Sequence, residues 1–496
     1  MDIQPTPIGS IDEIMQQSFE AFGAYRRKSP GDQAMFLERI AEEMESLGDE
    51  LINQASAETN LPYQRLLGER NRTTGQLRSF AAMVREGSWV DAAIDTAQPD
   101  RKPLPKPDIR KMMVPLGPVI VFGASNFPFA YSTAGGDTAA ALAAGCSVVV
   151  KAHEAHAKTS GMVALAISRA VSATQMPQYV FQHVYGSGKE VGKALVQHPL
   201  TAAVGFTGSH AGGRALFDYA GERKSVIPVF AEMGSTNPVI FLPEILKKNA
   251  EQLAELYAGS ITQSSGQFCT NPGILLGIQS PELDHFADLL AQKIEAMPAA
   301  KMLHEYIYQS FRSQRDKVVQ HPSVAVLNKT VQGDVLEAVP LVARTTGAAF
   351  LNDTWLGDEV FGPFSIIITC TTEEELRTVW LSLTGQLTTT FMGTDEDFEA
   401  FGELIALARN IAGRVIFNGV PTGVEVCPAM VHGGPYPATT DSRFTAVGIQ
   451  SVKRWIRPVC FQNAPEALLP PELRNNNERN IWRLVNNTWT KESIAS

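Results

Sequence analysis

One cysteine of this sequence lies where a nucleophile would be useful. Cys269 belongs to the glycine-containing segment SSGQFCTNP (264–272), which follows a long helical pattern and is expected to be a loop open to a cleft. An exposed thiol of this kind can attack a carbonyl carbon. The remaining cysteines lie in or beside apolar runs, where the residue usually serves as a small hydrophobe; they are Cys146, Cys370, Cys427 and Cys460. Because the five cysteines are scattered and form no CxxC pair, the sequence indicates a reducing compartment.

Polar side chains also follow the segments that we expect to be strands. Asn126 comes after PVIVFGA, and its side-chain amide could donate to an oxyanion, although turn formation is the simpler explanation of an isolated asparagine there. Lys151 follows CSVVV and precedes His153 and Glu154, a set that could bind ribose hydroxyls or form a solvated charge pair. The two histidines of HEAH are three positions apart instead of the four of HExxH, so we predict no metal site.

Two glycine-containing loops could approach a phosphate. Gly186, Gly188 and Gly192 open a helical segment after an expected strand, but the surrounding residues do not form a P-loop and the pattern alone is a weak signal. The segment GFTGS (205–209) places Ser209 near a helix N-terminus, where the hydroxyl and the helix dipole would both favour a phosphate. Ordinary N-capping explains Ser209 equally well.

The elements that must position these residues change in character along the chain. Residues 11–86 carry apolar side chains at helical spacing, whereas 101–114 hold three prolines within five residues, typical of an extended arm. From Gly117 onward, short β-branched runs alternate with alanine-rich helical stretches, which predicts about five parallel strands in a doubly wound, Rossmann-like α/β sheet. A second α/β pattern begins near residue 236 and predicts a separate lobe.

Composition narrows the class of protein. The chain has 496 residues, of which 44% are hydrophobic and 19% charged, so it is neither disordered nor fibrous. Its formal charge of −10 argues against a broad nucleic-acid-binding surface. The first residues lack a basic segment followed by an apolar core, and no apolar run reaches about 18 residues. We therefore expect a soluble, cytoplasmic protein that binds neither nucleic acid nor membrane.

Six motifs taken together resemble the NAD(P)-dependent aldehyde dehydrogenase superfamily over nearly the whole chain. They occur in the order FGASNFP, VVVKAHE, VGFTGS, EMGSTNP, GQFCTNPG and EVFGP. The resemblance is strongest to the 2-oxoglutarate semialdehyde (2,5-dioxopentanoate) dehydrogenases and to the NADP-dependent long-chain fatty aldehyde dehydrogenases, which share one template. We favour oxidation of 2-oxoglutarate semialdehyde to 2-oxoglutarate, with a long-chain alkanal as the alternative substrate.

The resemblance implies a role for four residues at the reacting carbon. Cys269 would attack the aldehyde to give a thiohemiacetal, with Asn126 and the Cys269 backbone N–H holding the oxyanion. Loss of hydride to the nicotinamide would leave a thioester, and Glu232 would activate the water that hydrolyses it. His432, in a C-terminal loop near the cysteine, is given a secondary acid/base or substrate-shaping role. A different class of activity, a thiol hydrolase or acyltransferase in which Cys269 pairs with His432, is the competing hypothesis.

The resemblance also implies cofactor contacts. Lys151 is expected at the adenosine ribose, and Gly208 and Ser209 at the pyrophosphate, while Glu359 and Phe361 are expected at the nicotinamide ribose and ring. The choice between NAD and NADP stays open. A carboxylate at Glu154 would accept from a free 2′-hydroxyl and repel a 2′-phosphate, whereas Arg214 could grip a 2′-phosphate with help from His153. A solvated helix arginine is the alternative for Arg214, and we predict that both cofactors work.

The same resemblance implies a division of the chain. Residues 1–100 and 115–235 would form the dinucleotide-binding domain and 236–430 the catalytic domain. Segments 101–114 and 445–460 would bridge subunits of a homodimer or homotetramer, because a proline-punctuated extended segment gains backbone partners by joining another sheet. Residues 461–496 would form a C-terminal tail at the surface.

Overall fold

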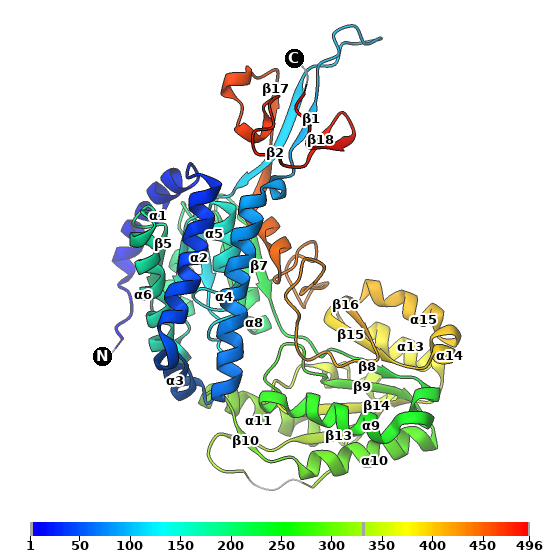
Figure 1. Cartoon of the computed structure of the whole chain (residues 1–496). Coiled ribbons are helices and arrows are strands. Elements are labelled where there is room, and N and C mark those ends of the chain that lie inside the picture. Colours follow the sequence, from blue (N-terminus) through cyan, green and yellow to red (C-terminus); the bar gives the residue numbers. More distant parts are fainter. Residues whose placement is uncertain (1–2, 330–332, 495–496) are drawn as a thin grey trace.

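A parallel five-stranded sheet forms the centre of the N-terminal unit. The computed structural model describes residues 3–329 and 333–494 (Figure 1). The strand order is β5-β4-β3-β6-β7, and all neighbours run parallel, as predicted for a doubly wound sheet. The strands are β3 (Val119–Phe122), β4 (Val148–Lys151), β5 (Phe181–Val184), β6 (Ala203–Thr207) and β7 (Val229–Glu232).

Helices cover both faces of this sheet because its strands are apolar on both sides. Val119 and Val121 of β3 point into one hydrophobic cluster, and Ile120 and Phe122 point into another, which is the alternation expected of a strand. The helices are α1 (Ile11–Tyr25), α2 (Pro30–Ser46), α3 (Gly48–Thr59), α4 (Tyr63–Glu86), α5 (Gly136–Ala144), α6 (Ala157–Ala173), α7 (Lys193–Gln197) and α8 (His210–Gly221). The helical interpretation of 11–86 is thus confirmed.

The second α/β unit contains a seven-stranded sheet in the order β11-β13-β14-β9-β8-β15-β16. Only the edge strand β11 runs antiparallel to its neighbour. The strands are β8 (Val239–Phe241), β9 (Ile274–Ile278), β11 (Ala325–Val326), β13 (Leu341–Thr346), β14 (Phe364–Cys370), β15 (Gln386–Met392) and β16 (Ala412–Phe417). Figure 1 shows this unit beside the first, as the separate lobe that the sequence predicted.

Helices also flank the second sheet, and a two-stranded ladder lies at its side. The helices are α9 (Pro243–Thr262), α10 (Pro281–Ala296), α11 (Glu305–Val319), α12 (Gly347–Asn352), α13 (Glu373–Ser382), α14 (Asp395–Ala400) and α15 (Gly402–Ala406), and the ladder joins β10 (Ala300–Lys301) to β12 (Glu337–Ala338). Over the residues that the structure describes, no helix is both long and apolar enough to cross a bilayer.

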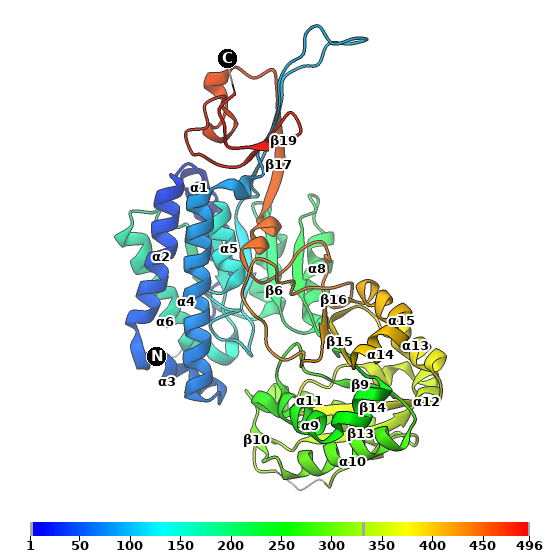
Figure 2. The same cartoon turned by 45° about the vertical axis from the view of Figure 1, so that its right-hand side comes forward.

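A third sheet projects from the N-terminal unit in both views (Figures 1 and 2). Its order is β17-β2-β1-β18-β19, and it brings distant parts of the chain together. The strands are β1 (Ala93–Asp95), β2 (Ile109–Pro115), β17 (Ile456–Gln462), β18 (Arg483–Val485) and β19 (Thr488–Thr490). β2 and β17 pair antiparallel from Ile456 opposite Pro115 to Gln462 opposite Ile109.

Just before β17, residues Ile449–Trp455 form a short 3₁₀ helix, and Trp455 is fully buried in the main hydrophobic cluster of the N-terminal unit. Two findings in this region differ from the sequence interpretation. The C-terminal segment is not only surface, since Leu473 and Ile481 are fully buried beneath the third sheet. Cys460, expected to act as a small hydrophobe, is exposed on β17. Tertiary packing, which local composition does not reveal, decided which of these side chains are buried and which are exposed.

Candidate active site

A strained turn sets the position of Cys269. After α9 ends at Thr262, Ser264, Ser265 and Gly266 adopt positive φ angles of 50°, 55° and 63°. At Gly266 a Cβ atom would overlap the backbone of Gly362, so the turn can approach that neighbouring loop only with glycine. The chain then reverses and delivers Cys269 to the junction of the two α/β units.

Cys269, His432 and Glu232 form a continuous line of polar contacts. The Cys269 Sγ lies 3.3 Å from His432 Nε2, and His432 Nδ1 lies 3.3 Å from Glu232 Oε2. His432 is 4% exposed and Glu232 is 5% exposed, so both groups are shielded from water. Burial opposes the imidazolium form, but the charges of Tyr131 and Cys269 and the hydrogen bonds to Cys269 and Glu232 outweigh it and raise the pKa of His432 well above its usual value.

The buried side chain of Arg454 lies next to Glu232. The Arg454 guanidinium is 2% exposed, and its Nη1 lies 3.9 Å from Glu232 Oε1. Its Nη2 forms an ion pair with Asp137 from the first turn of α5. Burial raises the pKa of Asp137, with Arg454 opposing and Glu232 reinforcing that shift. Arg454 therefore supplies positive charge to two buried carboxyl groups. Without this charge, each buried carboxylate would lack a cationic partner, which costs several kcal/mol.

Two asparagines hold the loop of Cys269 from opposite sides. The Asn126 side-chain amide follows β3 and donates to the Gln267 carbonyl at 3.1 Å. Asn237 is fully buried with φ 47°, and its amide donates to the carbonyls of Cys269 and Asn271, each at 2.9 Å. The predicted oxyanion donor, Asn126, thus lies beside the nucleophile's loop, and Asn237 fixes the backbone of that loop.

A narrow cavity opens at the thiol. Its lining includes Cys269 and His432 of the polar line, together with Arg72, Phe127 and Tyr131. Its wall therefore combines aromatic surface with one arginine, which suits a small organic substrate with a polar end.

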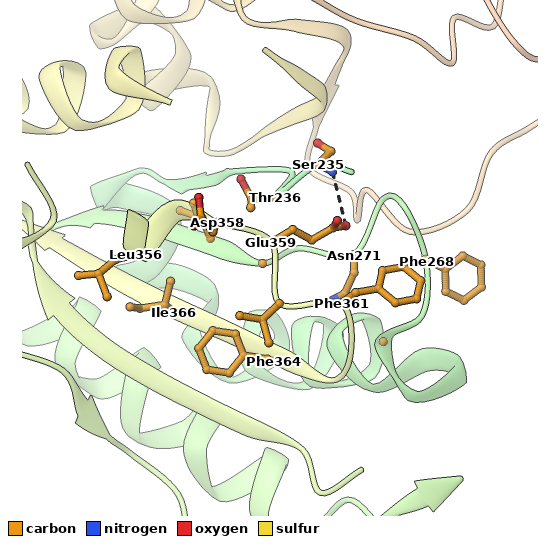
Figure 3. Close-up of a pocket in the computed structure, with 14 residues that line it drawn as sticks. Ser235, Thr236, Phe268, Asn271, Leu356, Asp358, Glu359, Phe361, Phe364 and Ile366 are labelled. Atoms are coloured by element: carbon orange, nitrogen blue, oxygen red, sulfur yellow. Dashed lines mark hydrogen bonds between the residues drawn. The ribbon is translucent and has the colours of Figure 1, made fainter. Parts of the chain in front are cut away.

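A second cavity lies beside Phe268, the residue before Cys269, and Glu359 and Phe361 contribute to its lining (Figure 3). Phe268 lines both cavities, so the two are neighbours. In Figure 3 the Glu359 carboxylate extends toward Ser235, whose backbone N–H is 3.5 Å away. A Cβ atom at Gly234 would overlap that carboxylate. Burial raises the pKa of Glu359 to about 7, and the Ser235 N–H opposes the shift.

The structure places the other predicted cofactor residues at the first sheet. Lys151 ends β4 and is buried, with Nζ 3.9 Å from Glu154 Oε1; burial lowers the pKa of Lys151, and Glu154 opposes this. His153 accepts from the Ala155 N–H at 3.1 Å through Nδ1. Burial, then the neighbouring His156, Lys151 and His304, lower the pKa of His153 well below its usual value. A neutral His153 offers no positive charge to a phosphate.

Ser209 and Gly208 lie together at the start of α8. The Ser209 hydroxyl accepts from the Gly212 N–H at 3.2 Å, and a Cβ atom at Gly208 would lie 2.6 Å from the Phe206 ring. Arg214 points to solvent and is paired with Asp218, one turn along the same helix, at 2.6 Å. Arg214 therefore has the environment of a solvated helix arginine, which was the alternative to its binding a 2′-phosphate.

Gly186 lies just beyond the carboxyl end of the edge strand β5, whose Val184 pairs with the cofactor candidate Lys151 of β4. Its φ is 134°, and a Cβ atom there would lie 2.5 Å from Val191. Local packing therefore accounts for this glycine.

The remaining cofactor candidates fit a dinucleotide. In this sheet β3 lies between β4 and β6, so the chain reverses its direction of winding there and leaves a crevice beyond the carboxyl ends of the strands. The N-terminus of the twelve-residue helix α8 and the buried ammonium of Lys151 flank that crevice. Backbone N–H groups and a cation are what a pyrophosphate and a ribose require.

Three residues of the site were missed from the sequence. Arg72 and Tyr131 line the thiol cavity, and Arg454 supports Glu232. Arg72 lies among several arginines of one helix, and no local pattern distinguishes it. Tyr131 lies five residues after Asn126 in the same loop, so proximity to that candidate was the only available signal.

Comparison with known proteins was consistent with this geometry. Residues 8–434 match the family described as "Aldehyde dehydrogenase family". The chain is 47% identical to "Alpha-ketoglutaric semialdehyde dehydrogenase 2" of Azospirillum brasilense, covering 96% of this chain and 90% of that protein. It is 44% identical to "Alpha-ketoglutaric semialdehyde dehydrogenase" of Acinetobacter baylyi, covering 99% and 94%. The solved structure of "3,6-anhydro-L-galactose Dehydrogenase in Complex with NAP" has a TM-score of 0.77 at 20% identity, covering 93% of each chain.

Proposed function

Because this chain belongs to the aldehyde dehydrogenase family, we propose that it oxidises 2-oxoglutarate semialdehyde to 2-oxoglutarate with an NAD(P)⁺ cofactor. The observation that carries the chemistry is the line from Cys269 through His432 to Glu232, with a cavity open at the thiol. The high identity to two relatives named for this semialdehyde, over nearly their whole lengths, supports the choice of substrate.

In the first half of the reaction Cys269 acts as the nucleophile. His432 takes the thiol proton, which its 3.3 Å contact with Sγ allows, and Sγ bonds to the aldehyde carbon. The carbonyl π electrons move to oxygen, and the Asn126 amide with the Cys269 backbone N–H holds the resulting oxyanion of the thiohemiacetal. Asn126 must exchange its bond to the Gln267 carbonyl for the oxyanion.

The second half releases the acid. Bound NAD(P)⁺ supplies the acceptor for the hydride that converts the thiohemiacetal to a thioester. Glu232 removes a proton from a water molecule, the hydroxide adds to the thioester carbonyl, and the C–S bond breaks to free the carboxylate and the thiolate. Arg454 and His432 flank the Glu232 carboxylate and orient it for this task.

Residues of both units would hold the cofactor. Lys151 and Glu154 would bind the adenosine ribose, and Gly208 and Ser209 the pyrophosphate. Glu359 and Phe361 would hold the nicotinamide half. We propose that both cofactors are accepted and that NAD⁺ is preferred, because Arg214 is engaged by Asp218 and His153 is neutral.

The third sheet supports a further part of the proposal, a homodimer or homotetramer. β17 is an edge strand of that sheet, and much of its surface is exposed. An open edge carries unpaired backbone groups that a strand of another subunit can satisfy.

A substrate panel tests the proposed function. NAD(P)H formation is followed with 2-oxoglutarate semialdehyde and with alkanals of increasing length, using NAD⁺ and NADP⁺ in turn and Cys269→Ala as the inactive control. We expect the highest kcat/KM for the semialdehyde. Preference for long alkanals would assign the fatty aldehyde activity instead. Ester hydrolysis without dinucleotide that exceeds aldehyde oxidation would support the thiol hydrolase hypothesis, which the Cys269–His432 contact also accommodates.

A further inference from the structure

The thiol cavity contains an arginine that has no acidic partner within the described part of the chain. Arg72 projects from α4 into the lining of this cavity and is partly buried. Its Nη2 donates to the Tyr131 hydroxyl at 3.3 Å, and its Nε is buried without a hydrogen-bond partner. Among the described residues, no carboxylate lies within ion-pair distance of Arg72. A partly buried guanidinium that faces a cavity without an acidic partner can bind an anion there.

The acid nearest in sequence is already engaged. Glu69 precedes Arg72 by one helical turn, but its Oε2 accepts from Arg65 at 2.6 Å and its Oε1 accepts from the backbone N–H groups of Phe129 and Ala130 at 2.8 and 2.9 Å. Glu69 is 6% exposed, so these three donors are its fixed environment. It has no free oxygen with which to neutralise Arg72.

Two other arginines of α4 form ordinary ion pairs with glutamates at the surface. Arg78 binds Glu45 through two hydrogen bonds of 2.6 Å, and Arg85 binds both oxygens of Glu38. Both pairs are exposed. Arg72 differs from them in facing a cavity and in lacking an anionic partner, so its charge is available to a ligand.

Contacts connect Arg72 to the reacting sulfur. The Tyr131 hydroxyl that receives the guanidinium belongs to a ring whose centroid lies 6.0 Å from that of His432, and His432 Nε2 lies 3.3 Å from the Cys269 Sγ. All four side chains line the same cavity. A ligand held by Arg72 therefore extends toward the thiol.

We propose that Arg72 binds the carboxylate of the aldehyde substrate and makes the enzyme selective for short semialdehydes over alkanals of equal length. This inference rests on the proposed function and identifies the residue that would give its specificity. The planar guanidinium can donate two parallel hydrogen bonds to a carboxylate, and Tyr131 orients it. An alkanal would occupy the cavity while leaving the cation without an anion, which penalises it.

A second arginine, Arg414, holds a loop that contributes to the lining of the thiol cavity. Arg414 of β16 donates to the carbonyls of Pro421 and Gly423 at 2.5 and 3.0 Å, and Gly423 and Val424 line the cavity. Because both of these guanidinium contacts are to backbone carbonyls, Arg414 acts as a positioning residue for that loop. Arg72 remains the group that contacts the substrate.

Matched variants of α4 test this assignment. Arg72→Leu, Arg72→Lys and the surface control Arg78→Leu are compared with the parent enzyme on 2-oxoglutarate semialdehyde and on pentanal, which has the same number of carbons and no carboxylate. For Arg72→Leu we expect kcat/KM for the semialdehyde to fall on the order of 10²- to 10³-fold, mainly through KM. We expect kcat/KM for pentanal to stay within about threefold or to rise, because leucine removes an unpaired cation.

Two further readouts separate specificity from a structural role. Inhibition by the product 2-oxoglutarate should weaken in Arg72→Leu by a factor similar to that for KM, and Arg72→Lys should restore part of both, since it keeps the charge and loses the bidentate geometry. Equal losses on both aldehydes, or an unchanged ratio between them, would overturn the assignment.

Failure of the proposed function would look different. If the parent enzyme does not oxidise 2-oxoglutarate semialdehyde, that substrate is refuted. The role of Arg72 is then decided by the same ratio for succinic semialdehyde against butanal. A ratio that collapses in Arg72→Leu supports carboxylate binding, and a ratio that does not change refutes it.

Discussion

Replacing His432 by glutamine tests the imidazole that lies between Cys269 and Glu232. Its contacts with both residues are 3.3 Å long, and its surroundings raise the pKa of His432 well above the ordinary value, which makes the ring a good acceptor for the thiol proton. Once the ring has taken that proton, its positive charge stabilises the thiolate beside it, as in other cysteine enzymes that pair the nucleophile with histidine. Glutamine keeps roughly the size of the side chain and removes the proton acceptor.

The expected loss follows from the role of the ring. A positioned side chain that transfers a proton contributes typically about 10²- to 10⁴-fold to a rate. Glutamine fills the same space but cannot accept the thiol proton, so we expect the variant to lose on the order of 10²-fold in acylation rate at pH 7. The loss should be smaller at alkaline pH, where the solvent can remove that proton.

Two assays measure this profile. The pH dependence of kcat/KM with the semialdehyde reports the acylation step, and alkylation of Cys269 by iodoacetamide without substrate reports the thiolate directly. His285→Gln, an exposed position on α10, is the control and should match the parent. A His432→Gln variant that keeps the parental alkylation rate at pH 7 would refute the ion-pair argument.

The same variant carries a stability signature. Because the folded-state pKa of His432 lies above the ordinary value of about 6.5, folding takes up a proton between those two pKa values. The resulting stabilisation is complete below about pH 6.5 and is lost as the pH rises through the folded-state pKa. The Tm difference between parent and His432→Gln should therefore be largest at acidic pH and narrow under alkaline conditions.

Four other substitutions have defined outcomes. Glu232→Gln should lower kcat by about 10²- to 10⁴-fold yet retain a burst of NAD(P)H in stopped flow, because the Cys269 thioester forms and is not hydrolysed; absence of a burst would contradict this order of steps. Asn126→Ala should lower kcat by about 10²- to 10³-fold in steady-state assays with KM little changed. Burial raises the pKa of Glu359 to about 7, so the folded parent loses stability as the pH rises from about 4.5 to 7. In denaturant titrations Glu359→Gln should therefore be as stable as the parent near pH 4.5 and more stable at pH 8, by on the order of 1–2 kcal/mol. This value is below the roughly 3 kcal/mol that the pKa shift alone would give, because the side chain is partly exposed. Gly266→Ala should cost on the order of 1–3 kcal/mol in urea denaturation, since it combines a positive φ with backbone overlap.

Local sequence determined a large part of the architecture. The apolar runs VIVF and VVVK are buried on both faces, which only a sheet covered by helices on both sides permits, and the parallel order of the first sheet follows from the short βα connections. Candidates for the reaction could also be named from the sequence. A nucleophile and a general base require particular side-chain types, and Cys269 and Glu232 offer these types in the segments GQFCTNPG and EMGSTNP.

Tertiary structure alone decided how these groups meet and which charges remain free. His432 is 163 residues from Cys269 and 200 residues from Glu232, so their contacts depend on how two separate sheets pack. Arg72 looks like its helical neighbours in sequence, and its lack of an acid follows from Glu69 being bound to Arg65 and to the 129–130 backbone. The physical reason is that the charge state and reactivity of a side chain depend on its partners in space, and a linear pattern of residues carries no record of those partners.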